Sequence, residues 1–107
     1  MPPETPPARH VIEALADPTR RAIVEALRAG PKPVGVIAGG LPVSRPAVSQ
    51  HLRVLTDAGL ARVTPKGNRR YYELAPEGVE SLRRYLDTLW DDALAAFADA
   101  ARKSARE

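Results

Sequence analysis

The sequence of 107 residues contains no cysteine. Disulfide bonds and thiolate metal sites are therefore excluded. The absence of cysteine fits a reducing compartment, and we expect a cytoplasmic protein. No apolar run approaches the roughly 18 residues that a membrane-spanning helix needs. The first residues also lack the charged, apolar and small-residue order of a secretion signal. We expect no membrane partner.

Residues that carry catalytic chemistry are also scarce. The chain has two histidines, and it shows no nucleophile–base pair, no glycine-rich phosphate loop and no cluster with metal-ligand spacing. On a helix, Ser49 and His51 would point to opposite flanks, about 160° apart, which is wrong for a catalytic pair. We expect no enzyme activity, no cofactor and no metal.

Positive charge is concentrated in one part of the chain. Residues 41–70 hold six Lys or Arg side chains and one acid, whereas the rest of the chain is slightly acidic. Such a concentration is typical of a protein that binds nucleic acid, although a solvated basic surface gives the same pattern.

The order of elements predicts one domain, residues 8–103, between an arm and a tail. Residues 1–7 include four prolines, so we expect a disordered arm, and residues 104–107 form the tail. The domain is mainly α with a small β-hairpin wing. We expect about five helices at residues 8–16, 18–29, 34–39, 44–58 and 76–103, a turn at Pro31 and Pro33, and strands at 60–65 and 69–74 joined by a tip at 66–68. This order is that of a winged helix-turn-helix.

The fourth predicted helix presents an outward face suited to DNA. With Val48, Leu52 and Leu55 at the centre of the buried face, the helical period turns small and hydrogen-bonding side chains outward. A solvated helix would more often carry Glu and Lys there. Gln50 could pair with adenine and Arg53 with guanine or a phosphate. The predicted reading residues are Ser44, Arg45, Pro46, Ser49, Gln50 and Arg53.

The hairpin tip would add contacts to the DNA backbone. Phosphate contacts hold a protein in register without specifying sequence. A solubilising turn is the alternative interpretation, because charged tips are common. The predicted wing contacts are Lys66, Asn68, Arg69 and Arg70. His51 lies on the flank of the fourth helix, where we favour a residue at the edge of the core over a phosphate contact.

Three segments resemble ArsR-type winged-helix repressors. Residues 14–24 (ALADPTRRAIV) are similar to the opening of these proteins, residues 43–55 (VSRPAVSQHLRVL) to their recognition helix, and residues 58–60 (AGL) with 67–72 (GNRRYY) to the wing. The resemblance covers residues 10–95. It implies a cytoplasmic, dimeric repressor that binds an inverted-repeat operator.

The metal-sensing motifs of that family are not matched. The third predicted helix has VGVIA where sensors carry cysteines, and the last helix has Asp87, Asp91 and Asp92 without a histidine. Carboxylates alone suit hard cations, so we interpret these acids as a solvated face. The chain resembles the cysteine-free branch of the family, and the inducer is unknown.

The last predicted helix carries a seam suited to a second copy of the chain. Val79, Leu82, Leu86, Leu89, Ala93 and Ala100 recur at heptad-like spacings. Packing of the whole helix on its own domain is the alternative, but exposed apolar surface of this extent usually marks a partner. The predicted dimer contacts, in the first and last helices, are Val11, Ile12, Leu82, Leu86, Leu89, Trp90, Ala93 and Phe97.

The sequence therefore predicts a homodimeric regulator that binds double-stranded DNA. A winged helix used for protein docking is the second hypothesis. The concentrated charge and the small outward residues of the fourth helix favour the first.

Overall fold

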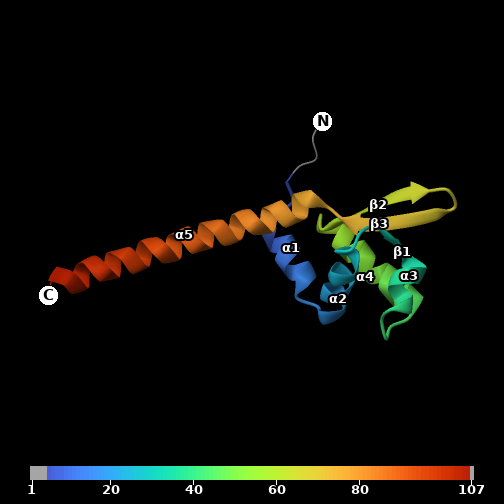
Figure 1. Cartoon of the computed structure of the whole chain (residues 1–107), viewed down its shortest axis with the longest axis horizontal. Helices are drawn as coiled ribbons and strands as arrows, with labels where there is room; N and C mark the ends of the chain where they lie inside the picture. The colour runs from blue at the N-terminus through green and yellow to red at the C-terminus, as the bar shows by residue number, and fades with distance from the viewer. Residues whose placement is uncertain (1–4, 107) are drawn as a thin grey trace.

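The computed structural model describes residues 5–106 and confirms a mainly helical chain with a small sheet (Figure 1). The helices are α1 Ala8–Leu15, α2 Pro18–Leu27, α3 Val34–Gly39, α4 Arg45–Asp57 and α5 Pro76–Arg106, and the strands are β1 Lys32–Pro33, β2 Ala61–Lys66 and β3 Arg69–Leu74. Helices α1 to α4 and the sheet form a head, from which α5 projects as a single long rod.

A short polar sequence builds the corner between α1 and α2. The side chain of Asp17 accepts a hydrogen bond from the backbone N–H of Arg20 at 2.9 Å, and Pro18 occupies the first turn of α2. This is the arrangement of an N-cap followed by proline. The guanidinium of Arg20 in turn donates to the carbonyl of Ala14 at 2.6 Å, and Arg21 bonds two further carbonyls at the end of α1. The side chains of Arg20 and Arg21 therefore cap the carboxyl end of α1.

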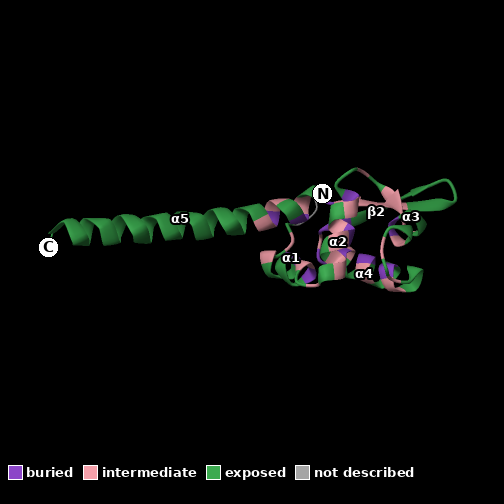
Figure 2. Ribbon diagram, turned by 60° about the horizontal axis from the view of Figure 1, so that its bottom comes forward, coloured by how far each residue is buried: buried purple, intermediate pink, exposed green. Residues whose placement is uncertain are grey.

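The core lies where α1, α2, α3 and α4 meet. As the helical period predicts, Val48, Leu52 and Leu55 of α4 have no exposed surface. In α1, Val11 has no exposed surface, although the sequence predicted it as a dimer contact. Ala14 is buried there, whereas Ile12 is 39% exposed and lies outside the core. Figure 2 shows that burial is confined to the head and the first turns of α5.

The sheet has a third strand that the sequence did not predict. Its order is β1-β3-β2, all antiparallel, and β1 pairs Lys32 with Tyr72 and Pro33 with Tyr71. Proline is tolerated because β1 is an edge strand with one bonded neighbour. The expected turn at Pro31 and Pro33 is therefore wrong at Pro33. The Nζ of Lys32 also donates to the carbonyl of Ala26 in α2 at 2.7 Å, which ties this strand to the head.

The hairpin tip is tighter than predicted. Lys66 pairs with Arg69, so Lys66 belongs to β2 and the loop is Gly67–Asn68 alone. Gly67 has φ +63°. A two-residue hairpin loop with glycine at its first position requires such a left-handed backbone.

Three segments meet in very close backbone contact at the start of α5. A Cβ on Gly78 would overlap the carbonyl oxygen of Gly59 and lie 2.9 Å from the Cα of Leu60. Gly59 itself has φ +83°, and a Cβ there would lie 2.7 Å from the ring of Pro6. The hydroxyl of Ser81, which is 5% exposed, donates to the carbonyl of Pro6 at 2.6 Å. These contacts fix where α5 leaves the head.

The same contacts reach the predicted arm. Residues 5–7 have no helix or strand, and Pro6 lies against Gly59 and Ser81. Residues 1–4 lie outside the described residues. At the other end, α5 continues to Arg106, three residues beyond the expected Lys103, and most of the predicted tail is helical.

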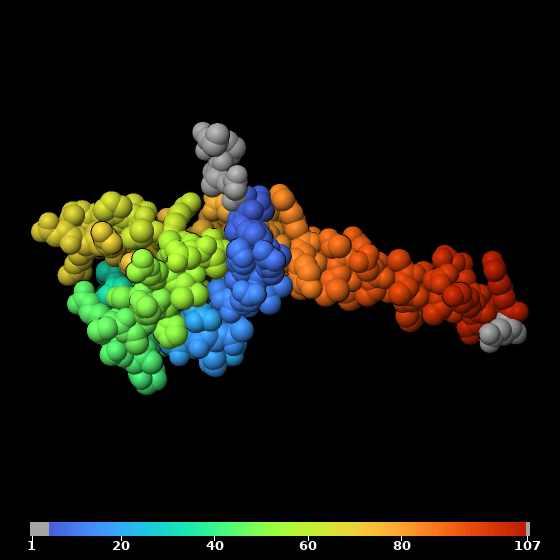
Figure 3. All heavy atoms as spheres, turned by 180° about the vertical axis from the view of Figure 1, so that it is seen from behind, coloured from blue at the N-terminus to red at the C-terminus, as the bar shows by residue number. Residues whose placement is uncertain are grey.

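From Arg83 to Arg106 every residue of α5 is exposed. Seen from behind, the helix extends as a bare rod from the head (Figure 3). None of the helices within residues 5–106 combines the length and the apolar character that crossing a bilayer requires.

Candidate nucleic-acid interface

The predicted reading residues form one exposed face of α4. Ser44 caps the helix by accepting a hydrogen bond from the N–H of Ala47 at 3.3 Å, and Pro46 lies in its first turn. Opposite the buried Val48, Leu52 and Leu55, the structure leaves a continuous solvent-facing surface. The exposed residues on it are Ser44, Arg45, Pro46, Ser49, Gln50 and Arg53.

The predicted wing contacts are exposed as well. Asn68 lies in the hairpin loop, Arg69 and Arg70 open β3, and Lys66 ends β2. The Nζ of Lys66 lies 5.9 Å from the centre of the Tyr71 ring. The guanidinium of Arg62, further down β2, instead bonds the carboxylate of Glu73 at 2.8 Å on the facing strand, and this hydrogen bond raises the pKa of Arg62.

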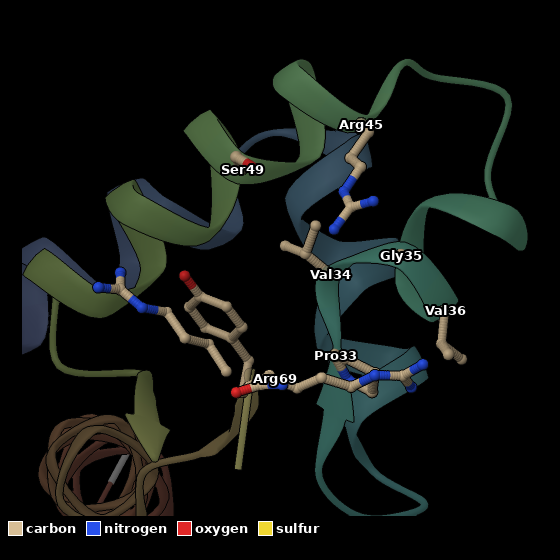
Figure 4. A pocket seen from close by; sticks show the side chains of 10 residues that line it. Pro33, Val34, Gly35, Val36, Arg45, Ser49 and Arg69 are labelled. Atoms are coloured by element: carbon tan, nitrogen blue, oxygen red, sulfur yellow. The ribbon is translucent and has the colours of Figure 1, made fainter. Parts of the chain in front are cut away.

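An open hollow of about 690 Å³ joins α4 to the wing, and we call it the arginine hollow (Figure 4). Its residues come from β1 and α3, from α4, and from β3 with its loop. They are Pro33, Val34, Gly35, Val36, Arg45, Ser49, Asn68, Arg69, Arg70 and Tyr72. The structure thus brings two predicted reading residues together with three predicted wing residues. Gln50, Arg53 and Lys66 lie outside this hollow.

The wall made by residues 33–36 was missed in the sequence. Val36 is 54% exposed and Gly35 is exposed, although the third helix of a small domain is expected to serve mainly as packing. The signal present in the sequence was the segment VGVIAG, a helix of only six residues with a glycine in its first turn. Small residues at such a place allow close approach of another group.

The arginines of this surface differ in their bonding from most others of the described residues, with Arg9 and Arg106 near the two ends as the exceptions. Among residues 5–106, Arg45, Arg53, Arg69 and Arg70 have no ion pair and no side-chain hydrogen bond within the protein. By contrast, seven arginines elsewhere are bonded to protein acceptors: Arg20, Arg21, Arg28, Arg62, Arg83, Arg84 and Arg102. One face of the head therefore carries positive charge that the described residues do not neutralise.

His51 lies at the edge of the core, as the sequence favoured. It is half-buried, and its Nδ1 is 4.0 Å from the carboxylate of Asp17. The N–H of Arg20, which bonds that carboxylate, holds the pKa of Asp17 below its ordinary value, and the charges of Arg20 and His51 act in the same direction. His51 thus faces the capped start of α2 rather than the arginine hollow.

The predicted dimer contacts divide into two groups. Val11 has no exposed surface, so it belongs to the core and leaves nothing for a partner to contact. Leu82 is half-buried against the core. The others remain exposed on α1 and α5: Ile12, Leu86, Leu89, Trp90, Ala93 and Phe97.

The acids of α5 stay dispersed along the helix. Asp87 pairs with Arg83 at 3.9 Å, and Asp91 and Asp92 are exposed. Within residues 5–106, no three His, Asp or Glu side chains come close enough to hold a metal ion.

The comparisons with known proteins agree with this geometry. The helix-turn-helix domain family matches residues 15–64, from the end of α1 into β2. The HTH-type transcriptional regulator Rv2034 of Mycobacterium tuberculosis is 57% identical over 86 residues, which is 80% of each chain. The transcriptional repressor SdpR of Bacillus subtilis is 38% identical, over 61% of this chain and 72% of its own.

A solved structure extends the likeness to the whole head. The homodimeric winged helix-turn-helix DNA-binding domain Mb0332 of Mycobacterium bovis, described as a possible ArsR-family regulator, superposes with a TM-score of 0.64 at 30% identity. The match covers 78% of each chain. By its sequence, its fold and its exposed recognition helix, the chain belongs to the ArsR family of winged helix-turn-helix transcriptional regulators.

Proposed function

We propose that this regulator is a homodimeric repressor that binds an inverted-repeat operator with the outward face of α4 and holds the DNA backbone with the wing. The observation that carries the proposal is a set of arginines on one face that have no ion pair or hydrogen bond among the described residues, beside a helix whose first outward side chains are small. These arginines are Arg45, Arg53, Arg69 and Arg70. Repression is supported by the name of the Bacillus subtilis relative, which is called a repressor.

The shape of α4 supports entry into the major groove. A helix with its side chains is about 10–12 Å across, and the groove is about 12 Å wide, so outward residues near the entry must be small. Ser44, Pro46 and Ser49 meet that requirement on the first turns of α4. Gln50 and Arg53 then supply the amide and the guanidinium that can pair with adenine and guanine edges.

The exposed apolar side chains of α5 support the dimer. Leu86 is 50% exposed, Trp90 65% and Phe97 75%, and these residues fall on one side of the helix. Burying them against a second copy of α5, with Ile12 of α1 at the edge, would remove this surface from water. A two-fold dimer would place the two α4 helices about 34–36 Å apart, one turn of DNA.

The proposal assigns the protein no catalytic step, no metal and no cofactor, and it places the protein in the cytoplasm with its DNA. What releases it from DNA is open. The alternative is a protein-docking role without DNA, for which wild-type protein would show no salt-dependent binding to a duplex.

The test is binding to a duplex selected from fragments of the source genome. Wild-type protein should bind the selected duplex with an affinity that falls steeply as salt rises. Gln50→Ala and Arg53→Ala should each lose about 1–3 kcal/mol of discrimination against a shuffled duplex while the circular dichroism spectrum is unchanged. Full binding by both variants would show that the reading face is wrong, and absence of salt-dependent binding by wild type would favour protein docking.

A further inference from the structure

The arginine hollow is chemically distinct from the outward face of α4. Its lining includes three arginines, an amide and a serine hydroxyl, and none of its lining residues is a carboxylate. Its volume of about 690 Å³ is ample for a phosphate group at the protein surface. A surface of this composition selects an anion.

Arg45 is directed into this hollow and away from the reading face. Its guanidinium carbon and one terminal nitrogen lie 3.8 Å from the point where a Cβ on Gly35 would be. Figure 4 shows Arg45 pointing from α4 toward Val34 and Gly35 of α3. The guanidinium thus lies beside Gly35 of α3, where it lines the same space as Arg69 and Arg70.

Three positively charged side chains line the hollow, and no acid among the lining residues offsets their charge. Arginine binds phosphate oxygens through two parallel N–H donors, and such charge-assisted bonds are about twice as strong as neutral ones. In the proposed complex, α4 and the wing contact DNA on either side of this hollow, so the strand between them would pass over it. The anion in reach is therefore a backbone phosphate.

We propose that the arginine hollow holds one phosphodiester group of the DNA backbone, and that Arg45 is a backbone clamp rather than a base reader. This inference rests on the proposed DNA binding and assigns one residue of that surface a separate task. Ser49 and Asn68 supply further hydrogen-bonding groups from the two walls of the hollow.

The salt dependence of binding distinguishes a clamp from a reader. Each phosphate contact that is lost reduces the slope of log affinity against log salt by about 0.9. Arg45→Ala should weaken binding to the selected and the shuffled duplex by the same factor, about tenfold for each subunit of the dimer, and should lower that slope by about two, because each dimer loses two phosphate contacts. Arg45→Lys should keep the slope, because the charge remains, but recover only part of the affinity. Arg28→Ala, which removes a charge paired with Glu25 on α2, is the matched control and should change neither quantity.

A second titration tests the hollow without DNA. In low salt, inorganic tripolyphosphate added to isotope-labelled wild-type protein should shift the NMR signals of Gly35, Arg45 and Arg69 together. Arg45→Ala should weaken that binding about tenfold, whereas Arg28→Ala should not. Tripolyphosphate should also compete with both duplexes.

Two results would overturn the clamp. One is a loss of affinity in Arg45→Ala for the selected duplex alone, which is the behaviour of a base reader. The other is the absence of tripolyphosphate shifts at these three residues. Failure of wild type to bind any duplex contradicts the proposed function instead, and the hollow is then judged on the tripolyphosphate titration.

Discussion

Replacing Gly78 with alanine adds one methyl group at the closest backbone contact described above. That Cβ would overlap the carbonyl oxygen of Gly59 and lie 2.9 Å from the Cα of Leu60. Both are backbone atoms of the turn between α4 and β2, so no side chain can rotate away to make room. Either the first turn of α5 or the end of α4 must move.

The expected cost follows from two opposing effects. Overpacking at a site that cannot rearrange costs about 1–3 kcal/mol, and here the upper part of that range applies. Alanine is about 1 kcal/mol better than glycine inside a helix, which offsets part of the cost. The net loss in the free energy of unfolding should be about 2 kcal/mol, or roughly 10 °C in Tm for a domain of this size.

Gly39→Ala is the matched control. Gly39 is the last residue of α3, its φ lies outside the left-handed region, and a Cβ there would have no neighbour within 4 Å. Alanine should therefore leave stability unchanged or raise it by up to about 1 kcal/mol. The two variants make the same chemical change with opposite expected signs.

Urea unfolding followed by circular dichroism measures both variants. It should be run at several protein concentrations, because a dimer gains stability by mass action. If Gly78→Ala is as stable as wild type at every concentration, the close contact between α5 and the α4–β2 turn does not exist as described.

Three further predictions concern the dimer, the corner and the arm. Phe97→Glu should convert the dimer to monomer in sedimentation equilibrium, because it places a charge in the apolar surface of α5; a dimer of unchanged affinity would exclude this face as the interface. The pKa of Asp17 is held below its ordinary value of 3.8, mainly by the N–H of Arg20, so its charged form stabilises the fold above about pH 4 and that stabilisation is lost on further acidification. The Tm advantage of wild type over Asp17→Asn should therefore shrink between pH 5 and 3 as measured by calorimetry, and a constant difference would contradict the assignment. Ser81→Ala should cost about 1 kcal/mol by removing the hydrogen bond to Pro6, and should speed proteolysis of the arm; unchanged protection would show that the arm is held by other contacts.

The parts of the fold that the sequence predicted well depend on local chemistry. Asp17 before Pro18, and Ser44 before Pro46, mark helix starts whose capping bonds the structure confirms. The buried face of α4 follows from helical period alone, because its apolar residues are large and regularly spaced.

The parts that it missed depend on contacts between distant segments. Strand β1 exists because β3 supplies its partner, and a pair of prolines gives no local sign of that pairing. The burial of Val11, which the sequence predicted as a dimer contact, is decided by how α1 lies on α4 and α5. The arginine hollow requires α3 and the wing to be adjacent, which is a property of the tertiary fold.

The bare length of α5 sets how this regulator would respond to its own abundance. Most helical stability in proteins comes from packing of an apolar face, so a second chain against the exposed turns of α5 would stabilise them. The species that binds DNA would then form in proportion to the square of the free chain concentration. Occupancy of an operator would rise more steeply with protein concentration than in simple proportion. When cell division dilutes the protein, this dimer would leave the DNA sooner than a monomeric repressor of equal affinity would. Thus the 31-residue helix α5, which lies outside the proposed DNA-binding face, would determine the concentration of protein at which the gene is silenced.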